Sequence, residues 1–204
     1  SERSKISQIL ATIDSLIIKT EALIAKLRQV KAGVLHDLLT CGLDDNGEIR
    51  DPIRHPEQFK DSPLGRIPKG WTSQQMGEAL LKRPRNGFSP KEASSFTGAF
   101  VLGLGCLTAD GFETIQLKPI NFADVHEENI LQDGDLLISR SNTSNLVALS
   151  GIFRDFGYVC IYPDLMIRLN PKPYLIAQFL ELMIRYSKLR DYLIRNANGT
   201  SASM

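Results

Sequence analysis

A chain of 204 residues has room for one domain with an appendage or for two small domains, and its 43% hydrophobic and 23% charged residues are ordinary for a folded globular protein. The formal net charge of +1 argues against indiscriminate binding to polyanions. The three cysteines are far apart and include no CxxC spacing, so they indicate neither a disulfide framework nor a zinc site, and we expect a reducing cytoplasm as the compartment.

No membrane association is expected either. The N-terminal residues lack the basic and then apolar pattern of a signal peptide. The longest uncharged stretch, residues 93–109, contains three glycines and is a poor membrane span.

The near-neutral total conceals local charge. Residues 82–92 carry four basic side chains against one acid, residues 110–135 carry seven acids against one lysine, and residues 164–204 carry six basic side chains against three acids. Any surface that binds nucleic acid must therefore be a local patch, with an acidic region elsewhere.

Residues 1–42 carry a sustained seven-residue repeat. With Ile6 as position a, eight of the ten a and d positions are aliphatic: Ile6, Ile9, Ile13, Leu16, Leu23, Leu27, Val30 and Val34. Position e is apolar at Leu10, Ile17, Ile24 and Leu38. The repeat predicts a long helical arm with a coiled-coil seam. Thr20 and Asp37 interrupt the seam and are suited to fixing its register, and Gly42 stands where a helix-ending glycine belongs.

The arm needs a partner. A helix of about 37 residues is about 55 Å long at 1.5 Å per residue, too long to bury its stripe against one small domain. We expect a second helix to cover it, and a homodimer through this arm if the chain is expressed alone. The alternative is a core helix of a helical bundle.

The composition changes abruptly after the arm. Glycines, prolines and Asp or Asn residues punctuate the chain between Cys41 and Pro68, which predicts a connector over residues 43–60. The segment Asp44–Glu48 resembles a calcium loop only loosely, because the 12-residue ligand spacing is missing, and we expect a turn.

Residues 61–204 then alternate short β-like runs with turn residues. The expected strands are Phe100–Leu104, Thr114–Leu117, Leu136–Ser139, Val147–Phe153, Tyr158–Ile161 and Leu165–Leu169. A helical stretch from Tyr174 to about Asn196 follows. The prediction is an α/β (α+β mixed) domain with an irregular, mostly antiparallel sheet and a C-terminal helix.

Catalytic motifs are missing from the sequence. It contains no GxSxG, HExxH or GxxxxGK[ST], and the glycines at 103 and 105 lack the third glycine of a dinucleotide fingerprint. The three histidines stand at no motif spacing from a carboxylate or cysteine. We therefore expect a non-enzymatic protein without catalytic residues, metal or cofactor. A small enzyme with an unrecognised site is the alternative.

Three polar loops are suited to DNA. One follows a buried strand and consists of Ser139, Arg140, Ser141, Asn142, Thr143, Ser144 and Asn145. A basic loop contains Lys82, Arg83, Arg85 and Asn86, and a C-terminal one contains Asn198, Thr200 and Ser201. Arginine can form two hydrogen bonds with the edge of guanine, and asparagine can do so with adenine, whereas a basic loop binds phosphates. Ordinary solvated loops are the alternative.

Several of these segments resemble type I restriction–modification specificity subunits. The likeness covers Lys60–Trp71 (KDSPLGRIPKGW), Asp133–Val147 (DGDLLISRSNTSNLV), Asn198–Ser201 (NGTS) and the arm, which starts with Ser1-Glu2-Arg3. The resemblance implies a non-catalytic chain with one conserved helix and one target-recognition domain. Such a domain recognises one half of a bipartite site in double-stranded DNA. The helix sets spacing and docks methyltransferase subunits, which a restriction subunit joins.

The resemblance also refines the site. Arg140, Asn142 and Asn145 are the strongest candidates for contacts to base edges, and Lys82, Arg83 and Arg85 for phosphates. Ser139, Arg140 and Gly199–Ser201 belong to segments that the family shares, so they can instead brace strand ends, because base-contacting residues should differ between targets. A pure assembly module, with the domain binding protein, is the competing interpretation.

Overall fold

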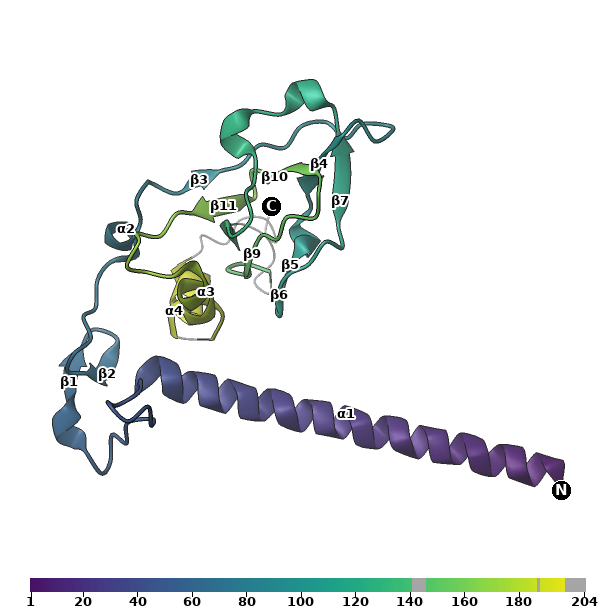
Figure 1. Cartoon of the computed structure of the whole chain (residues 1–204), viewed down its shortest axis with the longest axis horizontal. Helices are drawn as coiled ribbons and strands as arrows, with labels where there is room; N and C mark the ends of the chain where they lie inside the picture. The colour runs from purple at the N-terminus through teal and green to yellow at the C-terminus, as the bar shows by residue number, and fades with distance from the viewer. Residues whose placement is uncertain (141–145, 187, 197–204) are drawn as a thin grey trace. The chain divides into compact units, whose positions relative to one another are not determined.

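The computed structural model describes residues 1–140, 146–186 and 188–196, and the chain divides between Trp71 and Thr72 into two compact units. Figure 1 shows both units and labels most of their helices and strands. The predicted connector lies in the first unit together with the arm. The second unit contains the larger sheets and the C-terminal helices.

The predicted arm is helix α1, which spans Glu2–Thr40 without interruption (Figure 1). Its 39 residues correspond to about 58 Å at 1.5 Å per residue. The helix ends where Gly42 takes a φ of +63°, the left-handed conformation expected of a C-terminal glycine. At the seam, the Thr20 hydroxyl donates to the Leu16 carbonyl at 2.8 Å, so this polar side chain is satisfied within its own helix.

The rest of the first unit is folded rather than loose. A short 3-10 helix, η1 (Pro56–Gln58), leads into an antiparallel hairpin of β1 (Phe59–Ser62) and β2 (Gly65–Pro68). Phe59 and Ile67 of this hairpin are buried. A Cβ atom on Gly42 would lie 2.7 Å from the Trp71 ring, so the residues at the two ends of segment 42–71 are in close contact.

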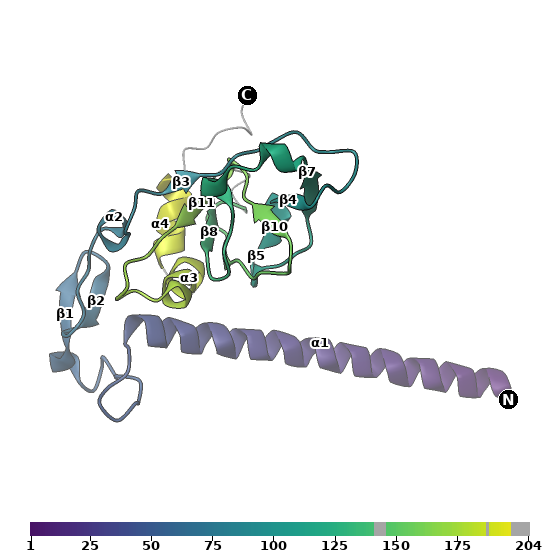
Figure 2. The ribbon, with the colours of Figure 1, turned by 45° about the horizontal axis from the view of Figure 1, so that its top comes forward.

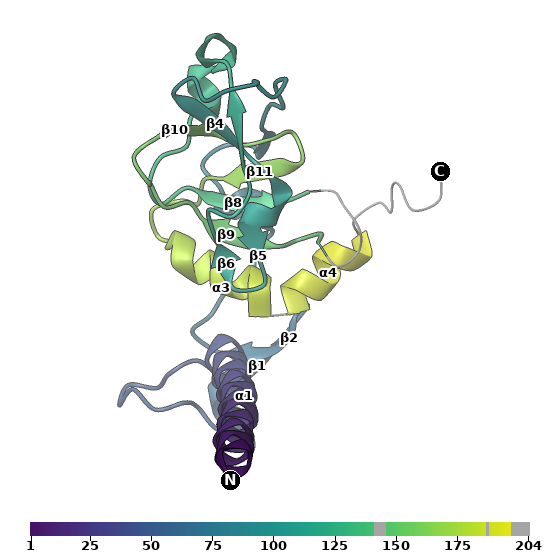
Figure 3. The same ribbon diagram turned by 90° about the vertical axis from the view of Figure 1, so that its right-hand side faces the viewer.

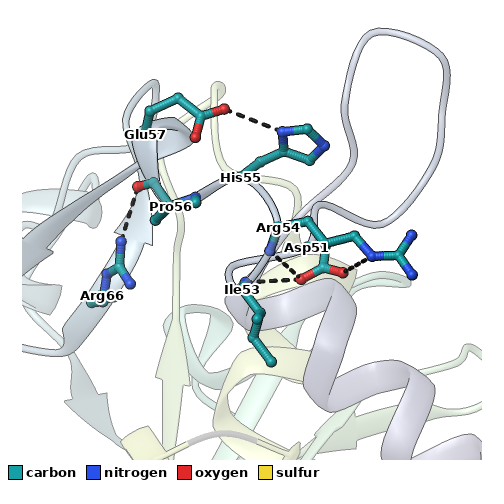
Figure 4. Close-up of polar contacts among 7 residues, drawn as sticks. All are labelled: Asp51, Ile53, Arg54, His55, Pro56, Glu57 and Arg66. Atoms are coloured by element: carbon teal, nitrogen blue, oxygen red, sulfur yellow. Dashed lines mark hydrogen bonds and ion pairs between the residues drawn. The ribbon is translucent and has the colours of Figure 1, made fainter.

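A polar turn precedes the hairpin (Figure 4). One carboxylate oxygen of Asp51 accepts the backbone N–H groups of Ile53 and Arg54 at 2.8 and 3.0 Å, and the other pairs with the Arg54 guanidinium at 3.5 Å. The hydrogen bond from the backbone N–H of Arg54, and to a smaller extent the one from Ile53, lowers the pKa of the Asp51 carboxyl. Arg66 donates to the Pro56 carbonyl at 2.9 Å and ties the turn to β2.

The second unit contains three groups of paired strands. The elements before the C-terminal helices are α2 (Met76–Ala79), β3 (Arg85–Asn86), β4 (Ala99–Leu102), η2 (Leu104–Cys106), β5 (Leu107–Thr108), β6 (Gly111–Phe112), β7 (Leu117–Ile120), η3 (Phe122–Asp124), η4 (Glu127–Asn129), β8 (Leu136–Ser139), β9 (Ser150–Ile152), β10 (Val159–Ile161) and β11 (Met166–Leu169). The sheets have the orders β3-β11-β8-β9, β10-β4-β7 and β5-β6. Among these pairs only β10–β4 is parallel, so the predicted mixed, mostly antiparallel fold class is confirmed for the described residues.

The four-stranded sheet is covered on both faces. Leu137 of β8 faces a core cluster shared with β4, β5 and β10, whereas its neighbours Leu136 and Ile138 face a second cluster. That second cluster includes Leu180 and Ile184 of α3, which packs against β9. Figures 2 and 3 show α3 (Ala177–Tyr186) and α4 (Lys188–Asn196) beside this sheet.

Most predicted elements are present with shifted ends. β8 occupies the predicted residues, and β4, β9, β10 and β11 lie within or one residue beyond the expected ranges. β7 begins at Leu117, where the predicted strand ends. The predicted C-terminal helix is two helices, α3 and α4. None of the described helices combines the length and the apolar character needed to cross a bilayer.

Candidate nucleic-acid interface

Ser139 closes the base of the loop that follows β8. It is only 3% exposed. Its hydroxyl accepts the N–H of Leu149 at 3.1 Å and donates to the Leu146 carbonyl. Its backbone N–H donates to the Leu149 carbonyl at 2.8 Å, and its carbonyl accepts the Ala148 N–H at 3.1 Å. All hydrogen-bonding groups of Ser139 are therefore used within the chain, which fits the bracing role and not a direct DNA contact.

Ala148 marks the other end of this loop. It has a φ of +59°, and among the described residues no other non-glycine residue has a positive φ. Such a conformation costs about 1 kcal/mol for an L-residue and persists only where the surroundings enforce it. Ala148 is buried and bonded to Ser139. Both ends of the loop are thus fixed by packing and hydrogen bonds.

Arg140 follows directly and is exposed, while its backbone N–H donates to the Leu165 carbonyl at 2.9 Å. The backbone is therefore anchored and the guanidinium accessible to solvent. Other predicted contact residues lie outside the described residues: Ser141, Asn142, Thr143, Ser144, Asn145, Asn198, Thr200 and Ser201.

The basic loop lies at an edge of the same sheet. Lys82 and Arg83 are exposed, and Arg85 and Asn86 form the edge strand β3. The Arg85 guanidinium lies 3.7 Å from the Glu128 carboxylate, and both side chains are more than two-thirds exposed, at 78% and 71%. Surface pairs of this kind contribute at most about 1 kcal/mol, so a phosphate group can compete for Arg85.

Strand β11 relates the two loops in space. The Arg140 amide is bonded to Leu165, whereas the Leu81 amide, next to Lys82, is bonded to the Asn170 carbonyl. Five residues of strand separate these points, about 16 Å at 3.3 Å per residue. Along the direction of β11, Lys82 and Arg140 are therefore offset by roughly five base-pair steps of DNA at 3.4 Å each.

Asn86 lies closer to the Arg140 end of the sheet. It pairs with Ile167 of β11, and on the other side of β11 Ile167 pairs with Ile138, two residues before Arg140. Two strand spacings of about 4.8 Å separate β3 from β8. The fold thus groups Asn86 with Arg140 and leaves Lys82 at the opposite end.

Arg168, which the sequence patterns did not single out, makes several hydrogen bonds inside the second unit. Its guanidinium donates to Asp135 at 3.1 Å and to the backbone carbonyls of Ile130 and Glu128 at 2.9 and 2.6 Å. It also lies 5.3 Å from the centre of the Tyr162 ring, and burial raises the pKa of that phenol. Arg168 therefore braces β11 from within. An arginine inside an otherwise apolar strand is the signal that points to such a role.

A second internal ion pair holds the β5–β6 turn. Arg185 of α3 lies 3.4 Å from Glu181 and donates to the Ala109 carbonyl at 2.6 Å. Burial raises the pKa of the Glu181 carboxyl, which the neighbouring Arg185 partly offsets. Because both side chains are nearly buried, their role is to fix the turn to the helix.

The two core cysteines have unreactive thiols. Burial raises the pKa of Cys160 to about 12, and it also raises that of Cys106, whose thiol donates to the Gln116 carbonyl at 3.1 Å. The thiolate is the nucleophilic form of cysteine. Both thiols are protonated at neutral pH, so neither is poised for covalent catalysis.

The arm presents its seam to solvent. Its eight aliphatic a and d residues are between 44% and 60% exposed: Ile6, Ile9, Ile13, Leu16, Leu23, Leu27, Val30 and Val34. Leu10, Ile17 and Ile24 at position e are 56%, 51% and 43% exposed. An apolar stripe of this length marks an interaction surface.

No protein-family model and no curated protein sequence matches the chain. Among solved structures, the crystal structure of the HsdS subunit from Thermoanaerobacter tengcongensis is similar, with a TM-score of 0.48 and 18% identity over 95% of this chain and 43% of that one. A structure from work on complex assembly and conformational transition of the type I R-M system has a TM-score of 0.46 and 17% identity over 95% and 42%. The chain spans less than half the length of either structure, and likenesses of this size do not assign it to a family.

Proposed function

We propose that this chain is a DNA-recognition module of a type I restriction–modification complex, without catalytic chemistry of its own. The observation that carries the proposal is the loop after β8. Its first residue, Arg140, is exposed on an anchored backbone, and Ser139 and Ala148 fix the two ends of the loop. A rigid scaffold that presents polar side chains is what base-specific contacts require. The segment Asp133–Val147, which resembles that family, contains this loop.

In this proposal the second unit recognises one half of a bipartite target in double-stranded DNA. Arg140, Asn142 and Asn145 contact base edges, and Lys82, Arg83 and Arg85 contact phosphates. The proposed contact surface also includes Asn86, Ser141, Thr143, Ser144, Asn198, Thr200 and Ser201. Ser139 braces the loop.

The arm is the proposed dock and spacer. Its length of about 58 Å exceeds one and a half turns of a duplex at about 34–36 Å per turn, enough to hold two DNA-recognition domains apart. Its exposed seam supports docking of methyltransferase subunits, through which a restriction subunit joins indirectly. In the absence of these partners the seam supports a homodimer.

The test compares two variants in a DNA-shift assay of the chain with its methyltransferase subunit. Arg140→Ala should relax sequence preference at one position of the target, because a lost base contact costs about 1–3 kcal/mol of discrimination. Lys82→Ala should instead weaken binding to all sequences alike and reduce the salt dependence by about one counterion. If Arg140→Ala weakened binding equally on every DNA sequence, Arg140 would not be a base-contacting residue.

The exposed seam also favours a second candidate function, an assembly module that recruits protein partners without recognising DNA. The same assay separates the two. A complex that keeps its subunits but shows no sequence preference would support the assembly module.

A further inference from the structure

Three segments of the second unit meet at the end of the four-stranded sheet where Arg140 lies. The Arg140 N–H donates to the Leu165 carbonyl at 2.9 Å. Leu165 belongs to turn 163–166, which the Met166 N–H closes by donating to the Pro163 carbonyl at 3.0 Å. The segment after β3 lies along the same turn, because the Gly87 N–H donates to the Met166 carbonyl at 3.2 Å. The end of β8, turn 163–166 and the segment after β3 are therefore neighbours.

Asp164 lies in this turn, and the segment after β3 holds its side chain. The Ser89 hydroxyl donates to Oδ1 of Asp164 and accepts the Asp164 backbone N–H at 3.2 Å. Both residues are exposed. Within the part of the chain that the structure describes, Asp164 makes no ion pair and its other carboxylate oxygen, Oδ2, accepts no hydrogen bond. Because a carboxylate has about four acceptor sites on its two oxygens, Asp164 has acceptors left for a ligand.

A carboxylate at this place is unsuited to contact the DNA backbone. It repels phosphate groups, and at physiological salt such a repulsion is screened only beyond about 8 Å. The proposed phosphate contacts, such as Lys82 and Arg83, are basic instead. A carboxylate becomes favourable in a DNA interface where it accepts a hydrogen bond from an amino group on a base edge.

Two bases present such an amino group in the major groove. Cytosine presents its N4 amino group without a neighbouring acceptor on the same base, whereas adenine presents its N6 amino group beside the acceptor N7. The N7 lone pair lies next to an approaching carboxylate and repels it. Asp and Glu side chains therefore favour cytosine, whereas Asn and Gln, which carry a donor as well as an acceptor, favour adenine.

We propose that Asp164 contacts a base edge and selects cytosine, with Ser89 orienting its carboxylate. This inference rests on the proposed DNA recognition and adds a base contact from a segment other than the loop after β8. Arg140 and Asp164 then complement each other, because arginine donates to guanine and aspartate accepts from cytosine. The carboxylate also disfavours DNA without cytosine at this position, because it then lies against the duplex without a donor.

A purely structural role for Asp164 makes different predictions. In that case the contact with Ser89 only supports the turn that accepts the Arg140 N–H, and Asp164 does not touch DNA. Asp164→Asn separates the two roles, because the amide oxygen still accepts the Ser89 hydrogen bond while an NH2 group replaces the free oxygen. That NH2 group is a donor and cannot pair with the amino group of cytosine.

The test is a selection of DNA duplexes from a randomised pool by the chain together with its methyltransferase subunit, followed by sequencing. The unaltered chain should select a motif with a cytosine that Arg140→Ala leaves in place. Asp164→Asn should reduce the preference for that cytosine over the other bases by about five- to 150-fold, the range for one good side-chain contact to a base. The position that depends on Arg140 should be unchanged.

Two further variants serve as controls. Asp155 is an exposed aspartate in another turn, where its Oδ1 accepts the Gly157 N–H at 2.8 Å. Asp155→Asn makes the same change of charge and should retain the cytosine preference. Ser89→Ala removes the orienting hydroxyl and leaves the carboxylate, so it should lower the preference less than Asp164→Asn and leave the salt dependence of binding unchanged.

An undiminished preference for every cytosine of the motif in Asp164→Asn would overturn the inference and leave the proposed DNA recognition standing. Loss of the position that depends on Arg140 would overturn it too, because Asp164 would then act by supporting the turn. If the unaltered chain selected no motif at all, the proposed DNA recognition itself would be refuted, and this inference with it.

Discussion

Replacing Ser139 with alanine tests whether one buried hydroxyl fixes the loop after β8. The substitution leaves the Leu149 N–H, now 3.1 Å from the hydroxyl oxygen, without that acceptor. An unsatisfied buried donor costs about 1–3 kcal/mol. The Leu146 carbonyl loses its donor too, but that residue is 39% exposed and water can replace the hydroxyl. We therefore expect a loss of about 2 kcal/mol.

The neighbouring strand offers a matched control. Ser150 of β9 is 0% exposed, and within the described residues its hydroxyl makes no hydrogen bond. Ser150→Ala removes the same atom from the same sheet without breaking a bond. It should leave stability unchanged or raise it slightly, because a buried hydroxyl without a partner is unfavourable.

The assay is thermal unfolding of the two variants beside the unaltered chain. For a domain of this size, 1 kcal/mol corresponds to about 2–4 °C, so Ser139→Ala should lower Tm by about 4–8 °C. It should also weaken DNA sequence preference while leaving the salt dependence unaltered, because no charge changes. Equal Tm shifts for both serine variants would refute the assigned role of the Ser139 hydroxyl.

Two further predictions concern the core. A Cβ atom on Gly87 would lie 1.9 Å from the backbone carbonyl oxygen of Tyr162, so Gly87→Ala should lower the free energy of unfolding by more than about 2 kcal/mol. Gly77 has open space around it, so the control Gly77→Ala should not destabilise the chain. Denaturant titration measures the stability of both variants. Burial raises the pKa of Cys160 in the folded chain from 9.0 to about 12. Between pH 9 and 12 the folded chain therefore keeps the thiol proton while the unfolded chain loses it. The free energy of unfolding should fall by about 1.4 kcal/mol per pH unit over this range. Cys160→Val should abolish that part of the pH dependence, measured as the difference in unfolding free energy from the unaltered chain.

Each of these two predictions has an outcome that would contradict it. A Gly87→Ala variant as stable as Gly77→Ala would contradict the close approach at that glycine. A pH dependence that is the same with and without the thiol would contradict the raised pKa of Cys160.

The arm and β8 were predictable because their signals are local. A heptad repeat specifies a helix and its exposed stripe without reference to the rest of the chain, and the run Leu136–Ser139 between polar turns specifies a strand. The β1–β2 hairpin was not predicted, because Pro63 and Pro68 resemble the punctuation of a connector. In the structure Pro63 lies in the hairpin turn and Pro68 at the end of β2, where proline is tolerated.

The arrangement of the candidate site depends on contacts between distant residues, which single-sequence patterns do not contain. Asn86 and Arg140 approach each other only because β11, at residues 166–169, inserts between β3 and β8. The ion pair between Arg85 and Glu128 joins residues more than forty positions apart. The sequence could identify Ser139 as a shared residue, but its burial and its two hydroxyl bonds become visible only in the folded hairpin.

The most direct test of the central claim is methylome sequencing of cells that contain the methyltransferase subunit, with and without the gene for this chain. The account predicts a bipartite methylated motif that depends on the gene and that becomes degenerate in one half when Arg140 is replaced by alanine. Identical methylation with and without the gene, or a motif unaffected by changes in the loop after β8, would contradict it.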